Sequence, residues 1–199
     1  MSYGDFKLSQ LVQTFDLTLI EGSNYFASIP PATPSSQLIE LIKEQVDLAV
    51  AINTEKARSE LIIAPVLLEV RRQRQPHISL FSGIEFNVAP EIGLTGICDF
   101  ILSKDPEQLF ICAPVLMIVE AKNENLKNSF AQCIAAMIAG QIFNQQDNTP
   151  ISTIYGAVTS GTIWRFLSLA DKTVSIDLSE YYINKDLEQI LGILLHALT

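Results

Sequence analysis

The chain has 199 residues, of which 48% are hydrophobic and 18% are charged, and this composition indicates a folded globular protein rather than a disordered one. Its length suits one domain with a sizeable core. The formal net charge of −9 argues against strong non-specific binding to nucleic acid, because that affinity comes largely from cations that meet phosphates.

The sequence also predicts where the protein resides. The first ten residues, MSYGDFKLSQ, lack the basic start and apolar centre of a signal peptide, and no apolar run approaches the length of a membrane span. Cys98, Cys112 and Cys133 are widely spaced and lie in apolar contexts, which fits reduced core thiols better than disulfides. We therefore expect a cytoplasmic protein that does not associate with membranes.

Charge is unevenly distributed along the chain. Residues 1–55 carry two basic and seven acidic side chains, a balance of −5, whereas residues 56–74 carry five basic and two acidic side chains, a balance of +3. A solvated helix face is the preferred interpretation of the basic segment. A local patch that faces phosphates is the alternative that the sequence leaves open.

The first half of the chain predicts helices. Three prolines at 28–36 mark a turn, after which Ser35 or Ser36 can cap a helix whose apolar residues follow helical spacing over 37–52. A second helix is expected from Asn53 or Thr54 through SELIIAPVLLEVRRQ, with a kink or interruption at Pro65.

The second half of the chain predicts a sheet with two helices. ISLFSGIEFNVAP and LTGICDFILS indicate two antiparallel strands. QLFICAPVLMIVEAK predicts a central strand after Pro114, with a hairpin arm before Pro114 as an alternative that the sequence leaves open. An Ala-rich helix follows, then three strands joined at TSGT and ADK, then a closing helix. We expect an α/β fold in which helices flank a mixed central β-sheet, with residues 1–35 as an N-terminal helical extension and residues 36–199 as a single domain.

Charged residues interrupt two of the predicted core strands. Glu120 and Lys122 follow the apolar run at 115–119 and project on the same side, because side chains alternate along a strand. The preceding strand carries Asp99 between Cys98 and Phe100. If these strands are neighbours, Asp99 and Glu120 meet at the edge of the sheet with Lys122 beside them.

Such a group has a definite chemistry. Two converging carboxylates repel each other unless one is protonated or a cation lies between them, and Mg²⁺ resolves the conflict because it takes oxygen ligands and keeps several waters. A metal-bound water of lowered pKa can attack a phosphodiester, and the ammonium of Lys122 can position that water or neutralise charge on the phosphate. The competing interpretation is a surface salt bridge at a strand end, which contributes little to stability.

Asp99 followed by Glu120-Ala121-Lys122 resembles the PD-(D/E)xK signature of the restriction-endonuclease-like nuclease superfamily, and the resemblance spans roughly residues 54–170. The amino-acid sequence also resembles a bacterial, notably cyanobacterial, group of proteins within that superfamily. The Pro of the signature is absent, since Ile97 and Cys98 precede Asp99. The resemblance implies a restriction-endonuclease-like core in which Mg²⁺ or Mn²⁺ is bound by Asp99, Glu120 and the backbone carbonyl of Ala121.

The resemblance also implies supporting residues. The acid that the superfamily often takes from a preceding helix corresponds to Glu60, with Glu69 as the alternative, and the Gln of the following helix corresponds to Gln132. Asn123, Glu124 and Asn125 are expected to begin a loop after the strand.

Other residues of potential chemical interest are interpreted as structural. His77 and His196 have no third ligand at metal-binding spacing. Trp164 and Arg165 alternate faces of a strand, which predicts a core Trp and a solvated Arg.

Two hypotheses from different classes follow. The first is a metal-dependent nuclease that hydrolyses DNA, which it binds weakly or with help from a partner because of its acidic charge. A homodimer is compatible with this activity, since cutting both strands takes two sites. The alternative is a non-catalytic protein-interaction module that retains the nuclease fold.

Overall fold

The computed structural model describes residues 1–122 and 126–199, so the loop expected at 123–125 lies outside the described residues. The α-helices are α1 (Leu8–Phe15), α2 (Ser36–Ile52), α3 (Glu55–Arg58), α4 (Ala64–Arg74), α5 (Leu126–Gln146) and α6 (Leu187–His196). The strands are β1 (Thr18–Gly22), β2 (Ser79–Glu85), β3 (Ile97–Ser103), β4 (Val115–Ala121), β5 (Ile154–Thr159), β6 (Ile163–Ala170), β7 (Thr173–Asp177) and β8 (Tyr181–Tyr182). Short 3-10 helices span Tyr3–Asp5 and Pro90–Ile92, and a π-helical turn spans Ser59–Ile63.

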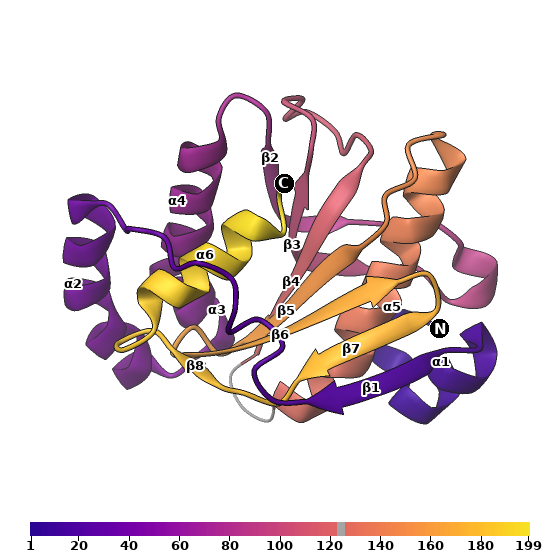
Figure 1. Ribbon diagram of the computed structural model, residues 1–199, viewed down its shortest axis with the longest axis horizontal. Coiled ribbons are helices and arrows are strands. Elements are labelled where there is room, and N and C mark those ends of the chain that lie inside the picture. The colour runs from indigo at the N-terminus through magenta and orange to yellow at the C-terminus, as the bar shows by residue number, and fades with distance from the viewer. Residues whose placement is uncertain (123–125) are drawn as a thin grey trace.

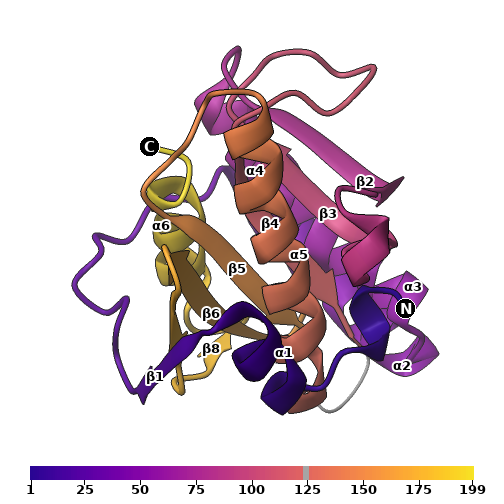
Figure 2. The same cartoon turned by 90° about the vertical axis from the view of Figure 1, so that its right-hand side faces the viewer.

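The strands form one mixed sheet in the order β1-β7-β6-β5-β4-β3-β2, with β8 paired to β6 (Figure 1). The β1–β7 and β4–β5 pairs are parallel and the others are antiparallel. α2, α4 and α6 pack on one face, whereas α1 and α5 pack on the other (Figures 1 and 2). The expected α/β fold, a mixed central sheet flanked by helices, is confirmed.

β4 is the most deeply buried strand, because all seven of its residues are buried. Ile118 packs in the core on the α5 side, whereas its neighbour Val119 packs in the core on the α2–α4–α6 side. A strand that is covered on both faces lacks the usual polar alternation, which explains the continuous apolar run at 115–119. A carboxylate at the end of this run is therefore placed in a poorly solvated environment.

The two expected helix starts are both capped. The Ser35 hydroxyl accepts a hydrogen bond of 3.2 Å from the Leu38 N–H at the start of α2. The Thr54 hydroxyl accepts one of 3.1 Å from the Ala57 N–H at the start of α3. The interruption expected at Pro65 is the π-helical turn, which ends just before this proline and separates α3 from α4.

The first residues of the chain join the main sheet. β1 pairs in parallel with β7, and this pairing was not foreseen in the sequence. The buried Tyr3 donates its hydroxyl hydrogen bond to the Phe86 carbonyl, which attaches the 3-10 helix at Tyr3–Asp5 to the segment after β2. Among the described helices, none is long and apolar enough to cross a membrane.

β2 is an edge strand whose outer main-chain groups are partly occupied. The side chain of Gln108 donates a hydrogen bond of 2.7 Å to the Leu80 carbonyl, and its oxygen accepts one of 3.4 Å from the Leu80 N–H. The segment between β3 and β4 thus folds back over the free side of β2.

Candidate active site

The ends of two neighbouring strands bring the predicted acids together. β3 and β4 are antiparallel, so the start of β3 lies beside the end of β4. Asp99 is near the start of β3, and Glu120 is near the end of β4. Asp99 Oδ2 accepts a hydrogen bond of 2.8 Å from the Ala121 main-chain N–H, which fixes the Asp99 carboxylate against β4.

Lys122 supplies a cation beside this pair of acids. Its Nζ lies 3.9 Å from Asp99 Oδ2 and 3.8 Å from Glu55 Oε1, and its side chain is 24% exposed. Its main-chain N–H donates a hydrogen bond of 2.8 Å to the Thr159 carbonyl, which extends the β4–β5 pairing by one residue. Ion pairs this long and this exposed add little stability, so their interest is chemical.

Asp99, Glu120 and Lys122 form one cluster, and Glu120 is its most unusual group. Its residue is 0% exposed, and its Oε2 accepts a hydrogen bond of 2.6 Å from Gln132 Nε2 on α5. Its other oxygen, Oε1, is buried and has no hydrogen-bond partner among the described residues. A buried carboxylate oxygen without a partner is unfavourable, and such groups need an explanation.

Burial raises the pKa of Glu120 well above its ordinary value of 4.5. The negative charge of Asp99 raises this pKa further, whereas the Lys122 ammonium opposes the shift. One cation thus compensates only part of the negative charge that the two acids would carry together. The cluster favours either a proton or a second cation at Glu120.

The helical acid that reaches the cluster is Glu55 rather than Glu60. Glu60 is 62% exposed and pairs at 3.1 Å with Lys56, four residues earlier on the same helical face, so it points to solvent. Glu55 lies in the first turn after the Thr54 cap, and its carboxylate faces Lys122. The position of Glu55 directly after the predicted helix start at Thr54 is the feature of the sequence that could have identified it.

Glu69, the other candidate for the helical acid, is bound by residues that join two helices. Its carboxylate accepts hydrogen bonds from the Ser35 N–H at 3.1 Å and from the Ser35 hydroxyl at 2.9 Å. It also pairs with Arg72 one turn along α4. These bonds join α4 to the start of α2, so Glu69 does not belong to the cluster.

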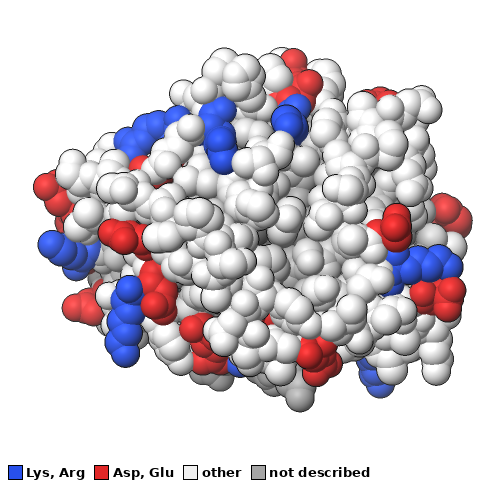
Figure 3. Space-filling view, viewed as in Figure 1, with Lys and Arg blue, Asp and Glu red and all other residues white. Residues whose placement is uncertain are grey.

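The basic segment 56–74 is largely engaged in internal bonds. The buried Arg58 donates to the Ser160 carbonyl at 3.0 Å, and Arg74 donates to the Leu195 carbonyl at 2.8 Å. On the face shown in Figure 3, basic and acidic side chains lie intermixed around the margin, with uncharged residues in the centre. These contacts favour a structural use of the arginines over a phosphate-facing patch.

The turn at 160–162, which joins β5 to β6, is held by hydrogen bonds from two residues. Arg58 contacts the Ser160 carbonyl, and Trp164 Nε1 donates a hydrogen bond of 3.0 Å to the Gly161 carbonyl. Thr159, which accepts the Lys122 N–H, precedes this turn. Trp164 is fully buried, as expected for a core residue.

Several groups of the cluster suit a hard divalent cation. The carboxylates of Asp99 and Glu120 and the adjacent Ala121 carbonyl are oxygen ligands of the kind that Mg²⁺ and Mn²⁺ prefer. Within the described residues, no three His, Cys, Asp or Glu side chains gather closely enough to hold a metal. An ion bound here would therefore take two carboxylates, and the main chain and water would complete its ligands.

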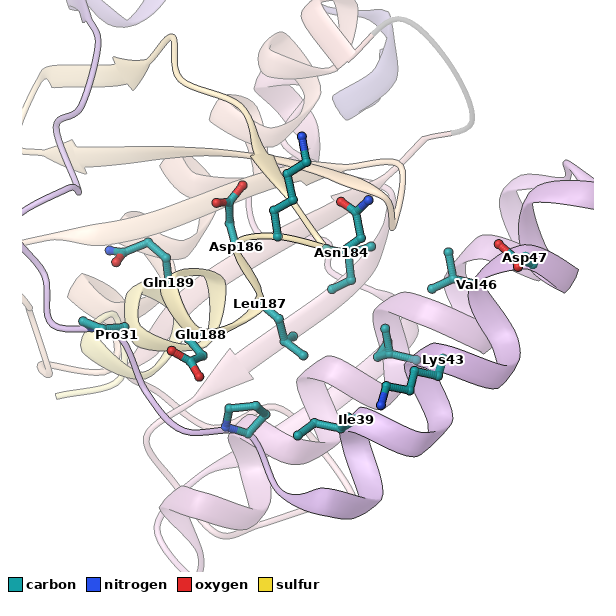
Figure 4. A pocket seen from close by; sticks show the side chains of 14 residues that line it. Pro31, Ile39, Lys43, Val46, Asp47, Asn184, Asp186, Leu187, Glu188 and Gln189 are labelled. Atoms are coloured by element: carbon teal, nitrogen blue, oxygen red, sulfur yellow. The ribbon is translucent and has the colours of Figure 1, made fainter.

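A separate cavity of about 590 Å³ lies between α2 and the start of α6 (Figure 4). Lys43 and Asp47 reach it from α2, and Asp186 and Glu188 reach it from the start of α6. It shares no residue with the cluster, and its charges are of both signs. We therefore place the candidate active site at the cluster and not at this cavity.

A scan against models of known protein families finds no match for this chain, and a search of curated proteins finds no significant relative.

Proposed function

We propose that this protein is a metal-dependent nuclease that hydrolyses phosphodiester bonds of DNA. The observation that carries the proposal is the buried Glu120 carboxyl group, which lies beside Asp99 and Lys122 and has one oxygen without a hydrogen-bond partner among residues 1–122 and 126–199. Two acids at a buried position do not stabilise the fold, because buried charges are costly to desolvate.

Each residue of the cluster has a role in this proposal. Mg²⁺ or Mn²⁺, when bound, would polarise the phosphate and lower the pKa of a water. Asp99 on β3 and Glu120 on β4 would hold the cation, and the carbonyl of Ala121, the residue after Glu120 on β4, would supply a third oxygen. Gln132 orients the Glu120 carboxylate through its hydrogen bond of 2.6 Å, so that Oε1 remains available. Lys122 stabilises negative charge that develops on the phosphate.

Glu55 is a positioning residue in this scheme. It shares the Lys122 ammonium with Asp99, at 3.8 Å and 3.9 Å respectively. Two acids on one ammonium hold the Lys122 side chain in the space between them.

The acidic charge of −9 limits affinity for DNA, so we propose weak or partner-assisted binding. A homodimer would allow both strands of a duplex to be cut, because each subunit carries one cluster. The resemblance to PD-(D/E)xK nucleases supports the reaction type.

A non-catalytic protein-interaction module is the second candidate. It is favoured by the internal bonds of Arg58 and Arg74, which leave the basic segment with few cations for phosphates. In that case Glu120 would remain protonated and the cluster would bind no cation.

Cleavage and metal binding are measured with matched variants. We expect Asp99→Ala and Lys122→Ala to lower Mn²⁺-dependent cleavage of plasmid and oligonucleotide DNA by on the order of 100-fold or more. Asp47→Ala and Lys43→Ala remove exposed residues of the same types on α2, and these controls keep wild-type activity. Calorimetric titration with Mn²⁺ gives a one-site isotherm for the wild type that is lost in Asp99→Ala.

The outcomes separate the two functions. Cleavage that persists in Asp99→Ala and Lys122→Ala comes from a contaminant and defeats the nuclease proposal. No heat of binding at millimolar Mn²⁺, together with no cleavage, supports the interaction module.

A further inference from the structure

A further cavity, of about 330 Å³, lies beside the edge strand β2. Residues 84–88 along and after β2, residues 109–111 between β3 and β4, and Phe143 on α5 line it. Figure 2 shows the connection between β3 and β4 as a long loop at the top of the molecule. We call this cavity, with Leu109 and Phe110 at its rim, the apolar edge surface.

Two large apolar side chains of this surface are open to solvent. Leu109 is 90% exposed, the highest fraction among the large apolar residues of the described chain, and Phe110 is 59% exposed. They follow Gln108, whose hydrogen bond of 2.7 Å to the Leu80 carbonyl attaches this segment to β2. A single exposed apolar residue is ordinary, whereas two in succession beside an apolar cavity indicate an interaction site.

The wall behind these side chains is apolar. The rings of Phe86 and Phe143 pack edge to face in it, with centroids 5.3 Å apart. Ile84, Val88 and Ile111 also line it and are partly buried against the core on the α5 side. The space suits insertion of a large apolar side chain, the kind of residue that anchors protein interfaces.

Acids lie around the apolar edge surface. Burial raises the pKa of Cys112, the residue next to the cavity wall, and the negative charges of Asp105, Glu107 and Asp147 raise it further. These three acids are therefore near the wall. Glu85 adds a fourth acid from the wall itself.

Cations do not balance these acids. Residues 75–121 contain six acids and one lysine or arginine, Lys104. Lys104 Nζ donates a hydrogen bond of 2.6 Å to the main-chain oxygen of Thr199. Asp105 and Glu107 accept main-chain N–H groups, which are neutral. Among the described residues, none of the four acids around the surface takes part in an ion pair.

This combination of charge and apolar area determines the kind of partner. Uncompensated acids repel the phosphates of nucleic acid and the surface of an anionic membrane. Two copies of the surface would likewise bring acid against acid. A basic protein segment is attracted by the acids and can bury an apolar side chain in the cavity.

We propose that the apolar edge surface docks a basic segment of a partner protein. The segment inserts a large apolar side chain beside Leu109 and Phe110, and its lysines or arginines lie against Glu85 and Asp147. Docking requires neither metal nor cleavage. Such a partner would also supply the phosphate contacts that partner-assisted binding of DNA requires, and that role alone rests on the proposed function.

Three labelled peptides measure this binding by fluorescence anisotropy with the full-length protein in EDTA. The first carries a Leu-Phe pair between two runs of three lysines, the second replaces the pair with serines, and the third replaces the lysines with glutamates. We expect the first peptide to bind about tenfold more tightly than either of the others, because each of these lacks one half of the complementarity.

Leu109→Ser tests the apolar contact against a matched control. Leu48, on α2, is also exposed, at 53%, so Leu48→Ser makes the same change on another face. We expect Leu109→Ser to weaken binding of the first peptide about tenfold and Leu48→Ser to leave it unchanged. Equal Tm values of the two variants show that the fold is kept.

Glu85→Gln and Asp147→Asn test the charge. Each removes one negative charge with little change in size, so we expect each to weaken binding of the first peptide about two- to fivefold at low salt and less at high salt. Glu44→Gln, which changes an exposed acid on α2, leaves the affinity unchanged.

Each result has a defined meaning. Equal binding of the first and second peptides, or equal affinities of Leu109→Ser and Leu48→Ser, would overturn the proposal. A dimer that Leu109→Ser dissociates in sedimentation would also overturn it, because a second copy would then occupy the surface. If the peptide results hold while no DNA is cleaved with Mn²⁺, the docking surface stands and the nuclease proposal fails. If cleavage depends on Mn²⁺ and Asp99 while no peptide binds, the reverse holds.

Discussion

Replacement of Glu120 by Gln tests whether the buried carboxyl group serves function rather than stability. The amide keeps the size of the side chain and an oxygen that can accept the Gln132 hydrogen bond of 2.6 Å. It removes the charge, and its NH₂ group can donate where Oε1 now has no partner within the described chain. We therefore expect Glu120→Gln to be more stable than the wild type in the absence of metal.

The size of the effect follows from the unpartnered group. A buried polar group without a partner costs about 1–3 kcal/mol, and more when it is charged, so a gain of about 2 kcal/mol is expected. For a domain of this size, that corresponds to a rise in Tm of about 4–8 °C.

The effect depends on pH in a defined direction. The pKa of Glu120 is raised in the folded protein, first by burial and then by Asp99, so the folded state holds its proton more tightly than the unfolded state does. The stabilisation by the protonated form is complete below the ordinary pKa of 4.5 and is lost as pH rises through the raised folded value. The Tm advantage of Glu120→Gln therefore grows as pH rises.

Thermal melts in EDTA from pH 5 to 9 measure this difference, with Glu44→Gln, an exposed acid on α2, as the control. Mn²⁺ at 100 times its Kd then adds about 2.7 kcal/mol to the wild type and nothing to Glu120→Gln. A variant that is less stable than the wild type by the same amount at every pH would refute the reasoning, because the fold would then depend on the charged group.

Four further variants test other contacts. Gln132→Ala removes the hydrogen bond that α5 donates to the Glu120 carboxylate, so Mn²⁺ affinity measured by calorimetry falls by about 10–100-fold; an unchanged affinity contradicts the orienting role. Glu55→Gln lowers the cleavage rate more than Glu60→Gln does, whereas each changes the free energy of unfolding by less than about 1 kcal/mol; equal rates would count against Glu55. Arg58→Lys lowers the free energy of unfolding in urea by about 1–3 kcal/mol, because an ammonium cannot replace the bonds to Ser160 and Thr162 together; wild-type stability would show that this clamp is dispensable. Gly156→Ala places a Cβ 2.6 Å from Met137 Sδ and 2.9 Å from Cys133 Sγ, so overpacking lowers stability by about 1–3 kcal/mol; a neutral effect would mean that these side chains move aside freely.

Local signals in the sequence were sufficient for much of the fold. The caps at Ser35 and Thr54, the β2–β3 antiparallel pair and the buried β4 strand each depend on residues that are close together in the chain. Asp99, Glu120 and Lys122 could be placed together because adjacent antiparallel strands bring the start of one strand to the end of the other.

Contacts between distant segments account for the features that sequence analysis missed. β1 pairs with β7, at the other end of the chain, and its short sequence has little apolar alternation that would predict a strand. Glu55 was overlooked in favour of Glu60, because the sequence does not show which end of a helix lies beside β4. Arg165 was expected in solvent because its partner Glu180 lies beyond β7.

The side chain of Gln108 has a consequence for how copies of this protein meet. An open edge strand is a template onto which a strand of another molecule can add, and such intermolecular pairing leads to aggregation. By occupying both main-chain groups of Leu80, Gln108 blocks this addition near the start of β2. This contact disfavours assembly of two copies through the start of β2, and a Gln108→Ala protein is expected to be more prone to self-associate into extended sheets.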